Sequence, residues 1–71
     1  MNSTMTRIEQ FENTAFHTYN LESKYTADTS LVTKAMIDVM FERHAPFADG
    51  EIEQVRDAIA KVVDEQTKRF K

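Results

Sequence analysis

The segment HAPFADG, residues 44–50, decides how this chain folds. It holds Pro46 and Gly50, the single proline and the single glycine among 71 residues. Proline disfavours helical backbone in the residue before it, and glycine permits a sharp turn. A continuous helix from residue 30 to residue 70 is therefore excluded. The polar cluster TADTS, residues 26–30, separates the earlier part of the chain in the same way.

The segments between these two turns have apolar residues at helical spacing and lack the alternation of strands. We expect helices at about 4–23, 30–43 and 50–70. Short loops between helices favour antiparallel neighbours. The sequence therefore predicts an all-α fold, a small antiparallel three-helix bundle that forms a single helical domain over residues 1–71, with the second helix in the middle.

Polar residues at the expected helix starts can cap the free backbone N–H groups there. Thr6 and Glu9 have the spacing of a capping box, and Ser3 is an earlier alternative. The second helix can be capped by Asp28, by Thr29 or by Ser30, and the third helix by Asp49. His44 falls at the end of the second helix, where a cationic side chain is favourable with the helix dipole.

The second helix is apolar around most of its circumference. Its main apolar arc holds six residues: Leu31, Val32, Ala35, Met36, Val39 and Met40. Ile37 and Phe41 lie beyond this arc, one turn apart, on the other side of the helix. We expect Ile37 and Phe41 to bind a partner, with Met36 and Met40 extending the surface by adaptable contacts. The alternative is that the first helix wraps across this side and buries the pair.

The first and third predicted helices differ in how strongly their sequences favour a stable helix. In the first, the stripe through Ile8, Ala15 and Tyr19 contains Glu12, either as an exposed carboxylate at its edge or as a buried acid with a cationic partner. Threonine, asparagine and histidine lower its intrinsic helicity. The third helix has a clean stripe and three oppositely charged i,i+4 pairs. We therefore expect the third helix to be the most robust and the first to fray most readily.

The residue types that carry most protein chemistry are scarce here. There is no cysteine, and the two histidines, His17 and His44, lack companions for a zinc site. The stretch at 48–52 resembles a calcium-binding EF-hand loop, but the ligand positions hold Ala45, Phe47 and Arg56 instead of oxygen donors. No base is placed to activate any of the eight threonines. We expect no metal, no cofactor and no enzymatic activity.

Charge and hydropathy narrow the remaining classes. Nine Lys and Arg against twelve Asp and Glu give a net charge of −3, which disfavours binding to nucleic acid. The chain opens MNSTMTRIEQ and has no apolar run near the ~20 residues of a membrane span, so we expect a soluble cytoplasmic protein. The sequence predicts a non-enzymatic protein-protein interaction module, accessory, inhibitory or regulatory, that binds another protein or itself as a homodimer. The alternative is a small helix-turn-helix-like DNA-binding regulator.

Overall fold

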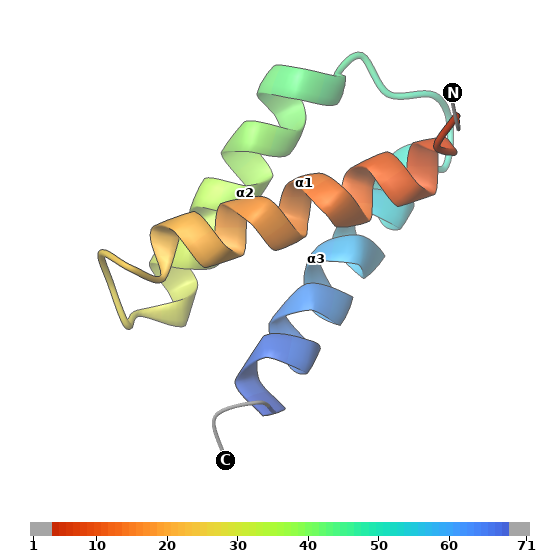
Figure 1. Cartoon of the computed structure of the whole chain (residues 1–71). Coiled ribbons are helices and arrows are strands. Elements are labelled where there is room, and N and C mark those ends of the chain that lie inside the picture. Colours follow the sequence, from red (N-terminus) through yellow and green to blue (C-terminus); the bar gives the residue numbers. More distant parts are fainter. Residues whose placement is uncertain (1–3, 69–71) are drawn as a thin grey trace.

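The computed structural model describes residues 4–68. Over this range the chain forms three α-helices, α1 (Arg7–Glu22), α2 (Thr29–His44) and α3 (Glu51–Lys68), each reversing the direction of the one before it (Figure 1). The predicted all-α three-helix bundle is confirmed. The first helix begins at residue 7 rather than residue 4. The alternative cap Ser3 and the end of the third predicted helix at residues 69–70 lie outside the described residues.

The starts of α1 and α2 follow the predicted capping pattern. Thr6 Oγ1 accepts a hydrogen bond from Glu9 N at 3.1 Å, and Glu9 Oε1 accepts one from Thr6 N at 2.8 Å. This reciprocal pair is the capping box. At α2 the cap is Asp28, whose Oδ1 accepts from Ser30 N at 2.9 Å. Local side-chain chemistry therefore sets where both helices begin.

The connection between α2 and α3 contains the two residues that interrupt the helix. The Ala45–Pro46 peptide bond is cis, and Gly50 has φ = +85°, in the region that only glycine adopts readily. The carboxylate that binds this turn belongs to Glu51, whose Oε1 accepts from Ala48 N at 2.9 Å. The expected cap Asp49 accepts no hydrogen bond from the backbone within residues 4–68.

The central helix is α1, and the prediction that the second helix lies in the middle is wrong. Helix α1 packs against both α2 and α3, whereas α2 and α3 make few contacts with each other. The reason is the small side chains on α1, because Thr14, Ala15 and Thr18 are all buried and allow close approach on two sides. The predicted stripe is rotated accordingly, and Ile8 lies half exposed. The core consists of Phe11, Ala15, Tyr19, Val32, Met36, Met40, Val55, Ala58, Ile59 and Val62.

The helices form two layers, with α1 in one layer and the α2–α3 pair in the other. Figure 1 shows α1 lying across both of the other helices. The molecule measures 33 × 26 × 17 Å, so its thickness is that of little more than one helix packed on another. The side of the α2–α3 pair that faces away from α1 is therefore left without a covering layer.

Candidate functional site

An apolar groove of about 280 Å³ lies between α2 and α3. None of its lining residues comes from α1, so the groove opens on the uncovered side of the α2–α3 pair. Five of the lining side chains are hydrocarbon or aromatic, one is a threonine and one is an arginine. The lining residues are Thr33, Ile37, Phe41, Ile52, Val55, Arg56 and Ile59.

The α2 wall of the groove contains the two side chains that the sequence singled out. Ile37 is 41% exposed and Phe41 is 47% exposed. The Phe41 ring packs edge-to-face on Phe47, with 5.1 Å between ring centroids, so its inner side is held while its outer side faces solvent. Helix α1 does not cover this side of α2. The alternative in which the first helix buries Ile37 and Phe41 therefore does not agree with the structure.

Met36 and Met40 do not belong to this surface. Both side chains are 0% exposed and lie in the core, where α2 packs against α1. The sequence placed them at the near edge of the apolar arc, but the centre of the buried arc runs through them. Their expected role as adaptable partner contacts is therefore wrong, and the partner surface is narrower on α2 than predicted.

The α3 wall of the groove was missed by the sequence analysis. Ile52 is 49% exposed, and Val55 and Ile59 form the buried floor beside it. Ile52 belongs to the same helical stripe as the core residues of α3, so its spacing gave no sign that it lies outside the core. Arg56, one turn after Ile52, is the charged member of the lining and makes no ion pair within residues 4–68.

The groove exposes enough apolar surface to matter for a protein of this size. Burying a whole Ile or Phe side chain is worth about 1.5–3 kcal/mol. The side chains of Ile37, Phe41 and Ile52 are each between 41% and 49% exposed. Burying the exposed part of all three would therefore contribute about 2–4 kcal/mol. A 71-residue domain has a total stability of about 4–11 kcal/mol. Covering the groove is therefore a substantial driving force for association.

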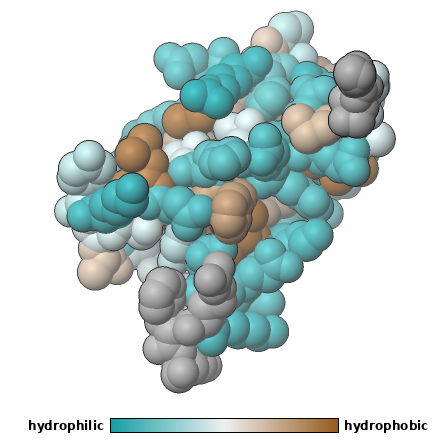
Figure 2. Space-filling view, viewed as in Figure 1, coloured by the Kyte–Doolittle hydropathy of each residue, from teal (hydrophilic) through white to brown (hydrophobic). Residues whose placement is uncertain are grey.

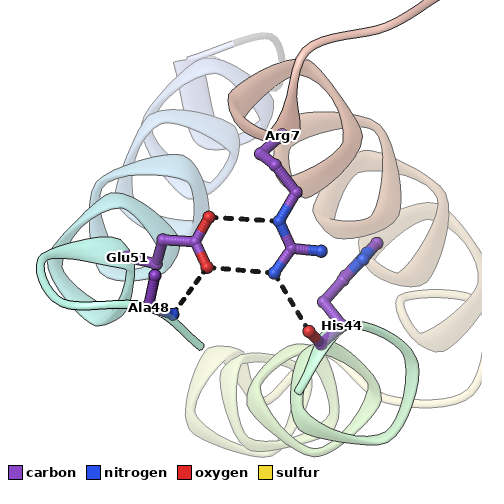
Figure 3. A network of polar contacts seen from close by, with 4 residues as sticks. All are labelled: Arg7, His44, Ala48 and Glu51. Atoms are coloured by element: carbon purple, nitrogen blue, oxygen red, sulfur yellow. Dashed lines mark hydrogen bonds and ion pairs between the residues drawn. The ribbon is translucent and has the colours of Figure 1, made fainter. Parts of the chain in front are cut away.

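A polar network at one end of the bundle joins all three helices (Figure 3). Arg7 Nε donates to Glu51 Oε2 at 3.1 Å, and Arg7 Nη2 donates to Glu51 Oε1 at 3.0 Å and to the His44 carbonyl oxygen at 3.0 Å. The Arg7 guanidinium also stacks over the Phe11 ring, 4.9 Å from its centroid. The hydrogen bonds from Arg7 and from the Ala48 backbone lower the pKa of Glu51 to about 2. The network therefore joins the start of α1 to the connection between α2 and α3.

The surroundings of His44 disfavour the cationic form that the sequence analysis expected at this helix end. Burial lowers the pKa of His44, and the positive charges of Arg7 and Arg43 lower it further. The ring packs edge-to-face on Phe11, with 5.2 Å between centroids. Its Nε2 lies 2.8 Å from Thr14 Oγ1, so one threonine does have a base beside it, contrary to the sequence analysis. Thr14 is buried, however, so an incoming substrate does not reach this hydroxyl.

A second hollow, of about 320 Å³, lies between α1 and α3, and its lining mixes charged residues with the apolar side chains of Met5, Phe16 and Val62. Three glutamates face it together with Lys61, which pairs with Glu12 at 3.4 Å. Glu12 is thus a half-exposed carboxylate with a cationic partner, between the two predicted alternatives. Lys61 takes this partner from α1, while the i,i+4 pair of Asp64 and Lys68 forms within α3 at 3.2 Å. Figure 2 shows this side of the molecule, which is largely hydrophilic with its apolar residues in separate patches.

Comparison with known proteins supplies no relative. No protein family, curated protein or solved structure matches the chain. Within the described range, no three His, Asp or Glu side chains gather closely enough to hold a metal ion. None of the helices formed by residues 4–68 combines the length and the apolar content needed to cross a bilayer. The groove between α2 and α3 is the more apolar of the two hollows and is the candidate site interpreted below.

Proposed function

We propose that this chain is a non-enzymatic protein-protein interaction module, an accessory, inhibitory or regulatory protein that binds through the α2–α3 groove. The observation that carries the proposal is the clustering of three half-exposed apolar side chains, Ile37, Phe41 and Ile52, around one groove. Scattered apolar residues are normal on protein surfaces, but apolar residues gathered around one concave feature mark interaction sites. The fold uses no disulfide, so we propose the cytoplasm as its compartment.

A protein fits this groove better than a small molecule. Ligand pockets enclose about 70–90% of the surface of a bound small molecule. The groove of about 280 Å³ leaves Ile37, Phe41 and Ile52 between 41% and 49% exposed, so it is an open surface feature rather than an enclosing pocket. Protein interfaces, by contrast, are built on apolar centres in which aromatic residues and arginine are enriched. Phe41 and Arg56 give this groove that composition.

The DNA-binding alternative lacks support from the start of α3, which would have to meet the nucleic acid. Two glutamates, Glu51 and Glu53, occupy the first turn of α3. Glu51 is paired with Arg7, whereas Glu53 is exposed and makes no ion pair within residues 4–68. The unpaired carboxylate of Glu53 at this place repels phosphate. We accordingly expect no salt-dependent shift of duplex DNA in a gel assay.

Photo-crosslinking from inside the groove tests the proposal. Thr33 lines the groove, and replacing it with p-benzoylphenylalanine places a photoreactive group there. We expect irradiation of cells that express this variant to give a defined adduct heavier than the 8.2 kDa chain. The matched control carries the same group at Thr67, an exposed position on α3 that does not line the groove.

The control and a groove variant decide the outcome. The proposal predicts that Thr33 crosslinks well above Thr67, and that adding Ile37→Ser abolishes the adduct. Equal yields from the two positions, or an adduct unaffected by Ile37→Ser, would overturn the assignment of the groove as the binding surface.

A further inference from the structure

We propose that Arg7 and Glu51 position the aromatic wall of the groove through the connection between α2 and α3, so that the polar network regulates binding there. The inference rests on the proposed function and adds its regulation. Neither residue lines the groove, and both belong to the network at one end of the bundle. Two observations carry the proposal: the way the network holds the connection, and the chain of rings that leads from the connection to Phe41.

One hydrogen bond of the network holds both ends of the connection. Its donor, Arg7 Nη2, also donates to the His44 carbonyl oxygen at 3.0 Å. Its acceptor, Glu51 Oε1, lies 3.0 Å from that donor and also accepts from Ala48 N at 2.9 Å. Residues 45–48 are not helical, so the position of their backbone depends on these anchors rather than on the hydrogen bonds of a helix. Figure 3 shows both anchors meeting at the ion pair.

Phe47 transmits the position of the connection to the groove. It directly precedes the anchored Ala48. Its ring packs edge-to-face on Phe11, with 5.9 Å between centroids, and on Phe41, with 5.1 Å. Phe11 is fully buried under the network, whereas Phe41 is 47% exposed and has room to turn. A displacement of Phe47 is therefore taken up by Phe41, which lines the groove, because the close-packed core on the other side does not yield.

The geometry of the pair suits it to act as this anchor. The Arg7 guanidinium makes two bonds to the Glu51 carboxylate, at 3.1 and 3.0 Å, and such paired bonds fix orientation as well as distance. The two side chains are 40% and 16% exposed. The pair of Lys61 and Glu12 also joins α1 to α3, but with one contact at 3.4 Å and with 54% and 35% exposure. It makes no hydrogen bond to the connection within residues 4–68, so it is the matched control.

Fluorine NMR of the full chain labelled with p-fluorophenylalanine measures the surroundings of each ring, with resonances assigned by single replacements with leucine. We expect Arg7→Gln to shift the resonances of Phe41 and Phe47 in the folded protein and to leave Phe16 unchanged. The control Lys61→Gln should leave Phe41 and Phe47 in place and shift Phe16, which lines the other hollow together with Lys61. A pair that only stabilised the fold would lower the melting temperature and leave the ring resonances of the folded protein unmoved.

A second variant keeps the test valid if Arg7→Gln unfolds. Arg7→Lys keeps the charge but loses the forked geometry, so it should shift Phe41 in the same direction by a smaller amount. In the crosslinking assay from Thr33, Arg7→Gln should lower the adduct yield by about twofold or more, and Lys61→Gln should not. A Phe41 resonance that stays in place in both Arg7 variants, that shifts equally in Lys61→Gln, or that shifts without any change in adduct yield would overturn the proposal.

The two readouts separate this proposal from the proposed function. If the wild type gives no adduct from Thr33 while Arg7→Gln still shifts Phe41, the proposed function is refuted and the positioning of the groove wall is retained. If the adduct forms and the Arg7 variants leave both Phe41 and the yield unchanged, the positioning role is refuted and the proposed function is retained.

Discussion

Two consecutive residues of α2, Met36 and Ile37, should behave in opposite ways when each is replaced by alanine. Met36 is 0% exposed in the core, and Ile37 is 41% exposed at the groove. Truncating a fully buried Met or Ile costs about 2–5 kcal/mol. About 60% of Ile37 is buried, so Ile37→Ala should cost about 1–3 kcal/mol in the monomer, and the better helix propensity of alanine recovers a few tenths.

Urea unfolding followed by circular dichroism measures both values, at a chain concentration low enough to exclude association. The slope of the free energy of unfolding against urea should be the same for both variants, since neither changes the area that unfolding exposes by much. We expect Met36→Ala to lower the stability by about twice as much as Ile37→Ala. Binding through the groove should rank the two variants in the opposite order, because Ile37 lines the groove and Met36 does not.

The same pair of variants can refute this reasoning. If Ile37→Ala destabilises the monomer as much as Met36→Ala, then Ile37 is a core residue and the groove is closed in solution. If both variants cost less than about 1 kcal/mol, the core does not centre on Met36.

Three further predictions follow from the polar network and from the order of the helices. The free energy of unfolding should fall as the pH is lowered below about 6.5, because folding lowers the pKa of His44 and the unfolded chain therefore binds the proton more readily. His44→Gln should flatten this pH dependence, whereas the control His17→Gln, at an exposed site, should not. Denaturation at pH 7.5 and at pH 5.5 measures the difference. Glu51→Gln should lower the melting temperature at pH 7 and remove part of the loss of stability between about pH 4.5 and pH 2. The reason is that the stabilisation by ionised Glu51 is present above its ordinary pKa and is lost as the pH falls toward its lowered pKa. Glu53→Gln in the same turn is the control, and an equal effect of the two variants would contradict the role of the network. Amides of residues 11–19 should exchange with deuterium no faster than those of α3, because α1 is the helix that packs on both of the others; faster exchange there would restore the ranking that the sequence favours.

Features that depend on neighbouring residues were predictable from the sequence. The capping box of Thr6 and Glu9 and the cap at Asp28 follow from residue type and spacing alone. The exposure of Ile37 and Phe41 follows from their angle on the helix relative to the other apolar residues. These are short-range properties, so they can be predicted without knowing how the helices pack against one another.

Features that depend on how the helices pack were not predictable. Thr14 and Thr18 count as polar in a periodicity argument, yet their burial makes α1 the central helix. Arg7 and Glu51 lie 44 positions apart, and nothing in their local sequence indicates that they pair. Met36 was assigned to the surface because spacing defines an arc but leaves the rotation of the helix against its neighbours undetermined.

The central claim is that the α2–α3 groove is the surface through which this chain binds protein. Amide chemical shifts of the labelled full chain, recorded over a dilution series and again in cell lysate, test it most directly, because they report whether the chain binds itself or another protein and where. We predict shifts at residues 33–41 and 52–59 in at least one of the two series, with the α1–α2 turn unchanged. Shifts centred on the exposed Leu21 and Tyr25 of that turn, or spectra that stay constant in both series, would contradict the account.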